Sequence, residues 1–304
     1  MLTATLLGTA AACPTVERNV SSIAVQREGE TLLFDCGEGT QRQMMRYGVG
    51  FSFREIFVTH YHADHILGIT GLLRTLGLMD RQEGVVLYGP RPAERVLGGL
   101  LRVGIERLKF PVEIVEVKPG DRLTRPEYDL VVFETDHRPG TLGFTLAEHT
   151  RLGRFNPDLA RDLGIPEGPL WGKIHRGEPV SLPDGRTVTA EAVVGPARPG
   201  RTMVYAGDTR PTPAVVEAAK GADLLIHEAT FGEDEAERAR ETGHSTARQA
   251  AEVARDAKAR RLVLTHISAR YSVGAPDLLA QACAVFPESV IARDGMTVEV
   301  PFLT

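Results

Sequence analysis

The sequence is poor in cysteine and has no long apolar run, and each absence narrows the class of protein. Its three cysteines, Cys13, Cys36 and Cys283, are widely separated and odd in number. This pattern argues against a disulfide framework and indicates reduced thiols, as in a cytoplasm. Because no run of about 18 apolar residues occurs, we expect no membrane span. The N-terminal stretch lacks a basic region, so we expect a first strand there and no signal peptide.

An excess of positive charge is also absent. The 304 residues include 35 Lys and Arg against 40 Asp and Glu, a net charge of -5. This balance gives no general attraction for phosphate, so binding of nucleic acid requires a local basic surface. The hydrophobic content of 42% is ordinary for a globular protein, and the length allows a sizeable core.

Short strand-like runs alternate with helix-like stretches along most of the chain. The patterns predict a hairpin of strands 22–27 and 31–35. Further strands are predicted at 55–59, 85–88, 112–117, 129–134, 142–147, 202–206, 223–227, 261–264 and 289–292. Helices are predicted at 66–78, 92–103, 212–220, 245–259 (with Ser245 as N-cap) and 276–285. Both halves mix the two element types, which favours an α/β fold of two sheets between outer helices.

Residues 153–200 differ in composition from the rest of the chain. They hold 8 Gly and 7 Pro among 48 residues, and this density breaks regular elements. We therefore expect one domain over residues 1–304, with 153–200 as an inserted, flexible arm that projects from it.

The densest group of metal-binding side chains lies directly after a predicted strand, in the run Thr59-His60-Tyr61-His62-Ala63-Asp64-His65. Imidazole and carboxylate ligands suit Zn²⁺ best, and Mn²⁺, Fe²⁺ or Co²⁺ also accept them. An extended backbone could put the imidazoles of His60 and His62 on one side. A turn at Ala63 could then aim Asp64 and His65 in another direction. One loop could then serve two metals. The alternative is a solvated, charged loop.

Three more candidates follow predicted strands. His137, Asp208 and His266 each come shortly after an apolar strand, and strand ends deliver side chains to a shared edge of a sheet. Each residue taken alone is as well explained as a cap, a turn or a surface group. Together with the His-rich loop, they predict a site for two metals.

Several motifs resemble known families. The pattern His60-x-His62-x-Asp64-His65 resembles the defining motif of the metallo-β-lactamase superfamily, whose members hydrolyse thioesters, lactams, lactones or phosphodiesters. Longer stretches are similar to the ribonuclease Z family, which trims tRNA 3′ ends; these are residues 14–19, 33–43, 164–170, 227–231 and 244–246. The resemblance spans nearly the whole chain.

This resemblance implies a metallo-β-lactamase αββα sandwich of two mixed sheets with outer helices and a protruding arm. It also implies two Zn²⁺ per chain. One would be held by His60, His62 and His137. The other would be held by Asp64, His65 and His266, with Asp208 bridging both.

The resemblance further implies the roles of the remaining site residues. His244, oriented by Glu228, would donate a proton, and Asp64 would accept one from the attacking water. Ser268 and Arg270 would lie near the scissile phosphate. In the arm, Trp171, Lys173 and Arg176 lie within six residues with no acid among them. An aromatic ring beside cations can contact RNA sugar, base and phosphate.

The implied reaction is hydrolytic removal of the 3′ trailer of precursor tRNA by a zinc-dependent endoribonuclease, a cytoplasmic homodimer. It leaves a 3′-hydroxyl on the tRNA and a 5′-phosphate on the trailer. Two positions depart from the family pattern: Val16 stands where a lysine is common, and Trp171 where a tyrosine is more usual. One alternative is another hydrolase of this fold, acting on a small phosphodiester or ester with no use for an arm. Another is an RNA-binding relative without activity, which would tend to lose ligands.

Overall fold

The computed structural model describes residues 1–105, 107–271 and 273–302. The chain divides into two compact units. The body consists of Met1–Ala147 and Thr202–Pro301, and the arm unit consists of Glu148–Arg201 with Phe302. Each unit is described by itself.

The body contains two seven-stranded sheets of mixed direction. The first has the order β16-β1-β2-β3-β4-β5-β6, with strands Met296–Glu299, Leu2–Gly8, Ser22–Arg27, Glu30–Phe34, Glu55–Phe57, Val85–Gly89 and Val112–Glu116. The second has the order β15-β14-β13-β12-β9-β8-β7, with strands Ser289–Ile291, Leu262–Thr265, Leu224–Glu228, Thr202–Tyr205, Leu142–Glu148, Tyr128–Glu134 and Arg122–Thr124. Strands β3 to β6 are parallel, and so are β12 to β15.

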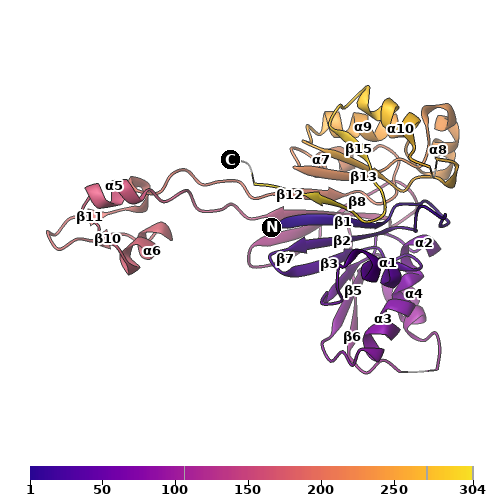
Figure 1. Cartoon of the computed structure of the whole chain (residues 1–304), viewed down its shortest axis with the longest axis horizontal. Helices are drawn as coiled ribbons and strands as arrows, with labels where there is room; N and C mark the ends of the chain where they lie inside the picture. Colours follow the sequence, from indigo (N-terminus) through magenta and orange to yellow (C-terminus); the bar gives the residue numbers. More distant parts are fainter. Residues whose placement is uncertain (106, 272, 303–304) are drawn as a thin grey trace. The chain divides into compact units, whose positions relative to one another are not determined.

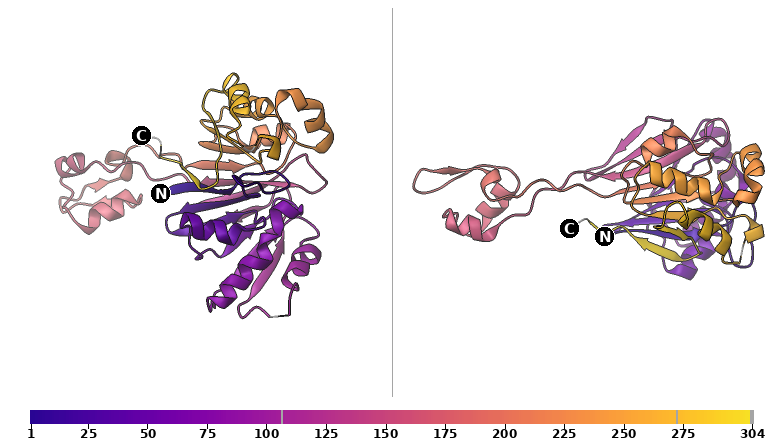
Figure 2. Two further views of the ribbon diagram at one scale, coloured as in Figure 1. Left: turned by 45° about the vertical axis from the view of Figure 1, so that its right-hand side comes forward. Right: turned by 90° about the horizontal axis from the view of Figure 1, so that it is seen from above.

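Helices cover the outer face of each sheet (Figures 1 and 2). The first sheet carries α1 (Thr40–Tyr47), α3 (Gly68–Leu78) and α4 (Ala93–Leu101), and the short α2 (Ala63–Ile66) precedes α3. The second sheet carries α7 (Pro213–Ala218), α9 (Ala247–Asp256) and α10 (Pro276–Cys283), with α8 (Ala236–Thr242) nearby. The four layers are the expected αββα sandwich.

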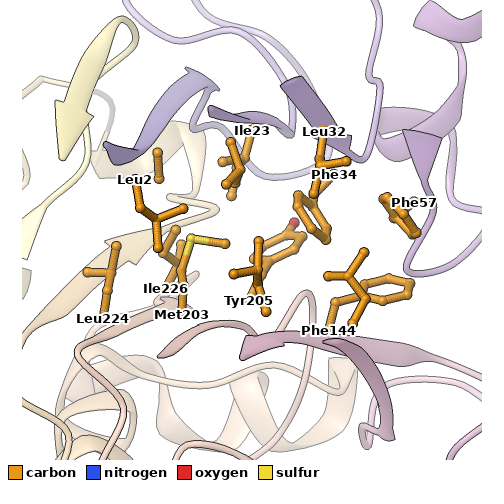
Figure 3. Close-up of a cluster of buried hydrophobic side chains, with 14 of the residues drawn as sticks. Leu2, Ile23, Leu32, Phe34, Phe57, Phe144, Met203, Tyr205, Leu224 and Ile226 are labelled. Carbon is orange, nitrogen blue, oxygen red and sulfur yellow. The ribbon is translucent and has the colours of Figure 1, made fainter. Parts of the chain in front are cut away.

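The central core lies between the two sheets. Figure 3 shows side chains from both sheets pointing into this layer, among them Phe34 and Phe57 of the first sheet and Phe144 of the second. The rings of Phe34 and Phe57 stack at 5.2 Å, and Phe144 tilts against both. Full burial of one such ring contributes about 1.5–3 kcal/mol. This layer holds the two sheets together near the strand ends that carry the polar residues.

The predicted hairpin over 22–27 and 31–35 is confirmed as β2 and β3. The prediction of Ser245 as a helix cap was wrong, because α9 begins after Thr246. The Thr246 hydroxyl accepts the N–H of Gln249, whose side chain returns to the Thr246 N–H. Ser245 instead donates its hydroxyl to the carbonyl of Thr209 at 2.6 Å. Strands β7 and β16 and helix α1 lay outside the predicted elements.

The arm unit has regular structure of its own. Its two ends form an antiparallel ribbon, here called the stem, of residues 148–155 and 194–201. The remainder, here called the head, covers residues 156–193 with α5 (Pro157–Asp162), α6 (Pro169–His175), η1 (Ala190–Ala192) and the hairpin β10 (Val180–Ser181) and β11 (Thr187–Val188). These elements enclose a small core of Ala160, Ile165, Ile174, Val180, Leu182, Val188 and Val193.

The expectation that glycine and proline would break this segment was wrong. Pro157 and Pro169 stand in the first turns of their helices, where a missing backbone N–H loses no hydrogen bond. Gly177 comes shortly after α6, with φ +94°. Among the residues described, no helix of either unit is long and apolar enough to cross a membrane.

Candidate metal centre

The proposed ligands lie just past the carboxyl ends of strands from both sheets. The His-rich loop follows β4, and His137 follows β8. Asp208 and His266 follow the parallel strands β12 and β14. Because parallel strands end at the same edge of a sheet, these side chains come together there.

One group of side chains gathers around His60. Its Nε2 atom lies 3.0 Å from Nδ1 of His62 and 3.7 Å from Oδ2 of Asp208. Nε2 of His137 lies 3.2 Å from the same atom of His62 and 4.0 Å from Oδ2 of Asp208. The four ligand atoms lie within 4.8 Å of one another. Four ligands about 2.0 Å from one zinc ion stand about 3.3 Å apart, so the spacing suits a single cation.

A second group gathers around the same Asp208 oxygen. His65 Nε2 lies 3.5 Å from Oδ2 of Asp208 and 3.5 Å from Oδ2 of Asp64. His266 Nε2 lies 3.3 Å from each of these two oxygens. Asp208 therefore stands between the two groups, where a bridging ligand would have to lie.

Hydrogen bonds to the far ring nitrogens fix the tautomers of four histidines. Nδ1 of His137 donates to the carbonyl of Gly243 at 2.8 Å, and Nδ1 of His65 to Asp35 at 2.8 Å. Nδ1 of His60 contacts the Thr59 hydroxyl, and that of His266 contacts the Thr230 hydroxyl. Both hydroxyls already donate to carboxylates, so they accept from the rings. This leaves Nε2 of His60, His137 and His266 with a lone pair for a metal, and Nε2 of His65 gains one when it loses its proton.

Orphaned polar atoms test whether a cation fits. Within the part of the chain that the structure describes, His65 Nε2 and Asp208 Oδ1 are buried and have no hydrogen-bond partner. Buried polar atoms are normally paired, and a place for an ion is one reason for an exception. Converging lone pairs also repel one another unless a cation neutralises them. The residues present therefore fit a divalent metal.

The electrostatics of the site agree with this arrangement. Burial lowers the pKa of His60 and His137, which keeps both rings neutral. Burial alone would raise the pKa of Asp208, but His266 and His65 outweigh it and hold the pKa well below its ordinary value. Despite its own burial, His65 has a raised pKa because Asp208 and Asp35 face it. A metal at its Nε2 would therefore displace a proton.

Glu228 and His244 form a separate pair beside the ligands. Glu228 is fully buried at the end of β13, and its Oε1 accepts Nδ1–H of His244 at 2.7 Å. Burial by itself would lower the pKa of His244, but the charge and hydrogen bond of Glu228 raise it to about 9. Ligand atoms of Asp208, His244 and His266 also lie within 4.8 Å of one another, so His244 has an alternative role as a ligand.

Three residues that orient the candidate ligands had no role assigned from the sequence: Asp35, Thr59 and Thr230. Asp35 accepts from His65 and from Thr59, and Thr59 in turn contacts His60. One buried carboxylate thus supports one ring in each ligand group. Asp35 has φ +54°, a left-handed conformation uncommon outside glycine. Asp35 directly follows β3, the parallel neighbour of β4, so a strand-end rule could have found it.

The predicted site residues Ser268, Arg270 and Trp171 lie outside the two ligand groups. Arg270 forms an ion pair with Glu235 on the surface, and Ser268 is half-buried beside it. In the head, the Trp171 ring packs on Phe155 at 5.1 Å, and its N–H donates to the carbonyl of Ile165.

The two cations predicted beside Trp171 differ in their surroundings. Lys173 is exposed, whereas Arg176 is paired with Glu178 at 3.1 Å. The structure thus brings the seven ligand candidates and His244 together and places the arm residues in a separate unit.

Two family models match parts of the chain. The model described as Beta-lactamase superfamily domain matches residues 173–267, and the model described as Anti-Pycsar protein Apyc1 matches residues 2–154. The second range contains the His-rich loop and His137, and the first contains Asp208 and His266. Every ligand candidate therefore lies in a matched range.

Proteins named ribonuclease Z match nearly the whole chain. That of Gemmatimonas aurantiaca is 58% identical over 97% of this chain and 94% of its own. That of Myxococcus xanthus is 56% identical over 99% of this chain and 98% of its own. That of Haloferax volcanii is 52% identical over 98% and 95%.

Solved structures give the same result. Human tRNase Z, short form, is 26% identical, with a TM-score of 0.71 over 99% of this chain and 100% of its own. A long form RNase Z from yeast, 21% identical, has a TM-score of 0.69 over 98% of this chain and 42% of its own, and its likeness bears on the fold alone. With the relatives covering both halves of the site, the chain has the metallo-β-lactamase fold and belongs to the ribonuclease Z family.

Proposed function

We propose that the protein is a metal-dependent endoribonuclease that removes the 3′ trailer of precursor tRNA by hydrolysis. The observation that carries the proposal is the convergence of seven metal-binding side chains beside the Glu228–His244 pair. The relatives named ribonuclease Z supply the substrate class.

The metal ions in this proposal are two Zn²⁺ per chain. His60, His62 and His137 would hold one, and Asp64, His65 and His266 the other, with Asp208 shared. Two such ions supply Lewis acidity, which lowers the pKa of water and neutralises charge on a phosphate. Five of the seven ligands have a further hydrogen-bond partner that orients them, namely His60, Asp64, His65, His137 and His266.

The chain's own groups then move two protons. A water oxygen attacks phosphorus, and Asp64 accepts the proton that this water releases. The bond from phosphorus to the ribose 3′ oxygen breaks, and His244 protonates that oxygen. Glu228 fixes the imidazole through Nδ1, so Nε2–H is the proton that is available. The tRNA keeps a 3′-hydroxyl and the trailer a 5′-phosphate. Ser268 and Arg270 would lie near the scissile phosphate.

The arm would contribute contacts to tRNA and no metal ligand, since no proposed ligand lies within residues 153–200. Lys173 and Arg176 are its proposed phosphate contacts in the head, and Trp171, which packs against the small core of the head, would support them. We further propose that the chain is one metallo-β-lactamase domain with this inserted arm, that it acts in the cytoplasm, and that it forms a homodimer.

The test is cleavage of a 3′-extended precursor tRNA, run beside bis(p-nitrophenyl) phosphate and a thioester. We expect the precursor to be cleaved at its 3′ side, the cleavage to stop with a chelator, and added Zn²⁺ to restore it. Hydrolysis of a small substrate without cleavage of the precursor would instead assign a small-molecule hydrolase of the same fold. RNA binding without hydrolysis of any substrate would assign a binding protein.

A further inference from the structure

The stem of the arm unit is a defined two-stranded ribbon. Arg151 and Arg198 exchange backbone hydrogen bonds of 2.8 and 2.9 Å, and Gly195 donates to the carbonyl of Arg154 at 2.9 Å. A Cβ atom on Gly153 would lie 1.8 Å from the carbonyl oxygen of Gly195, so the close approach of the strands requires glycine there. The stem therefore holds its side chains in a fixed order.

Charge is divided unevenly between the stem and the head. The stem carries four arginines and one glutamate, a formal charge of +3. The head carries four basic and six acidic side chains, a formal charge of -2. The near-neutral total of the arm unit thus conceals a basic ribbon.

The stem arginines repel one another. Arg151 and Arg198 form a hydrogen-bonded cross-strand pair, in which side chains stand opposite each other at a Cα separation of about 5.5 Å. Like charges in this position destabilise a ribbon. Slight burial and the charge of Arg198, together with those of Arg201 and Arg154, lower the pKa of the Arg151 guanidinium, although Glu148 opposes them.

The one acid of the stem relieves only part of this repulsion. The single stem acid, Glu148, accepts from Arg201 at 2.7 Å, and both side chains are buried. Arg151, Arg154 and Arg198 form no salt bridge with any residue in the described ranges. The Arg151 guanidinium instead lies over the ring of Phe302, 3.3 Å from its centroid.

The arginines of the head, unlike Arg151, Arg154 and Arg198 of the stem, form salt bridges. Each is paired with a nearby acid, in the pairs Arg161–Glu167 at 2.7 Å, Arg176–Glu178 at 3.1 Å and Arg186–Asp184 at 2.7 Å. Their charges are already balanced on the surface. Arginines without a salt bridge are therefore concentrated on the stem, and in the head a phosphate at Arg176 would compete with Glu178.

We propose that the stem, through Arg151, Arg154 and Arg198, binds the phosphate backbone of the precursor tRNA. The proposal rests on the proposed function, which supplies the polyanion. Guanidinium groups bind phosphate through paired N–H bonds, and a row of phosphates removes the repulsion that the ribbon otherwise carries. Such contacts position the RNA without reading its sequence.

The test compares two variants that each lack two positive charges of the wild type. Arg154→Gln with Arg198→Gln removes stem cations that form no salt bridge, although Arg198 Nε donates to the carbonyl of Leu152 at 3.1 Å. Arg161→Gln with Arg186→Gln removes head cations that are paired with acids. Arg151 is left in place because it packs on Phe302. The Kd for a 3′-extended precursor tRNA is measured over a series of salt concentrations, and thermal unfolding checks that each variant is folded.

Removal of one arginine–phosphate interaction should reduce the slope of log Kd against log salt by about 0.7–0.9 and weaken binding about sixfold at 0.1 M salt. We expect the stem variant, which lacks two such interactions, to bind about 40-fold more weakly, and the head variant to bind nearly as the wild type does. Arg154→Lys with Arg198→Lys should keep the slope. A stem variant that binds like wild type, or a head variant that is equally weakened, would overturn the inference alone. A wild type that does not bind the precursor would remove the proposed function together with it.

Discussion

Thr230 links one proposed metal ligand to the proposed acid. Its hydroxyl donates to Oε2 of Glu228 at 2.6 Å and accepts from Nδ1 of His266 at 2.9 Å. The side chain is 3% exposed, so water cannot replace it easily. The substitution Thr230→Val keeps the branched shape and removes only the hydroxyl, which isolates this link.

The size of the effect follows from the two bonds. A hydrogen bond to a charged group contributes about 1.5–3 kcal/mol, and a buried N–H left without a partner costs about 1–3 kcal/mol. Glu228 Oε2 keeps the N–H of Ser245 at 3.1 Å, so its carboxylate is not isolated. We expect the free energy of unfolding of the metal-free protein to fall by about 2–4 kcal/mol. Because His266 loses its orientation, metal affinity should fall by about 10–100-fold.

Urea unfolding of the metal-free protein gives the first quantity, and competition with a chromophoric chelator gives the second. Thr230→Ser is the matched control, since it keeps the hydroxyl, and it should retain most of the metal affinity. Wild-type metal affinity in Thr230→Val would refute the reasoning, because the orientation of His266 would then not depend on this hydroxyl.

Three further predictions concern the metal centre and the arm. Elemental analysis of the purified protein should approach two metals per chain, whereas one metal with full activity would contradict the roles of Asp64, His65 and His266. His244→Ala should lower kcat by about 10²–10⁴ at unchanged metal content, as for the loss of a general acid; loss of metal would make His244 a ligand instead. Replacing residues 155–195 with a short Gly-Ser linker should weaken precursor tRNA binding strongly and leave hydrolysis of bis(p-nitrophenyl) phosphate largely intact, since no proposed ligand lies there. A loss of both activities would make the arm structural.

The candidate ligands could be predicted because their cues are local. Three histidines and an aspartate fall within six residues, and the other candidates stand just after apolar strands. The structure shows why the strand-end cue works: β12, β13 and β14 are parallel, so Asp208, Glu228 and His266 meet at one edge. The contacts between particular ligands could not be predicted, because they depend on the order of the strands in each sheet. The apolar patterns in the sequence do not contain that order.

The orienting residues were harder to predict for the same reason. Thr59 and Thr230 act through hydroxyl groups, which are common in any sequence, and their roles depend on Asp35 and His266, which lie far from them in the chain. The arm shows a different failure. Counting glycine and proline identifies where elements stop, but not that Pro157 and Pro169 start helices or that seven apolar side chains enclose a core.

The chemistry of the product ends tests the central claim most directly. A precursor tRNA labelled at its 5′ or its 3′ end is incubated with the metal-loaded protein, and the ends of both fragments are determined. Attack by water, with His244 protonating the 3′ oxygen, predicts a 3′-hydroxyl on the tRNA and a 5′-phosphate on the trailer. A 2′,3′-cyclic phosphate on the tRNA, or a trailer with a 5′-hydroxyl, would contradict the account, because the ribose 2′ oxygen would then be the nucleophile and the metal-centred hydrolysis would not occur.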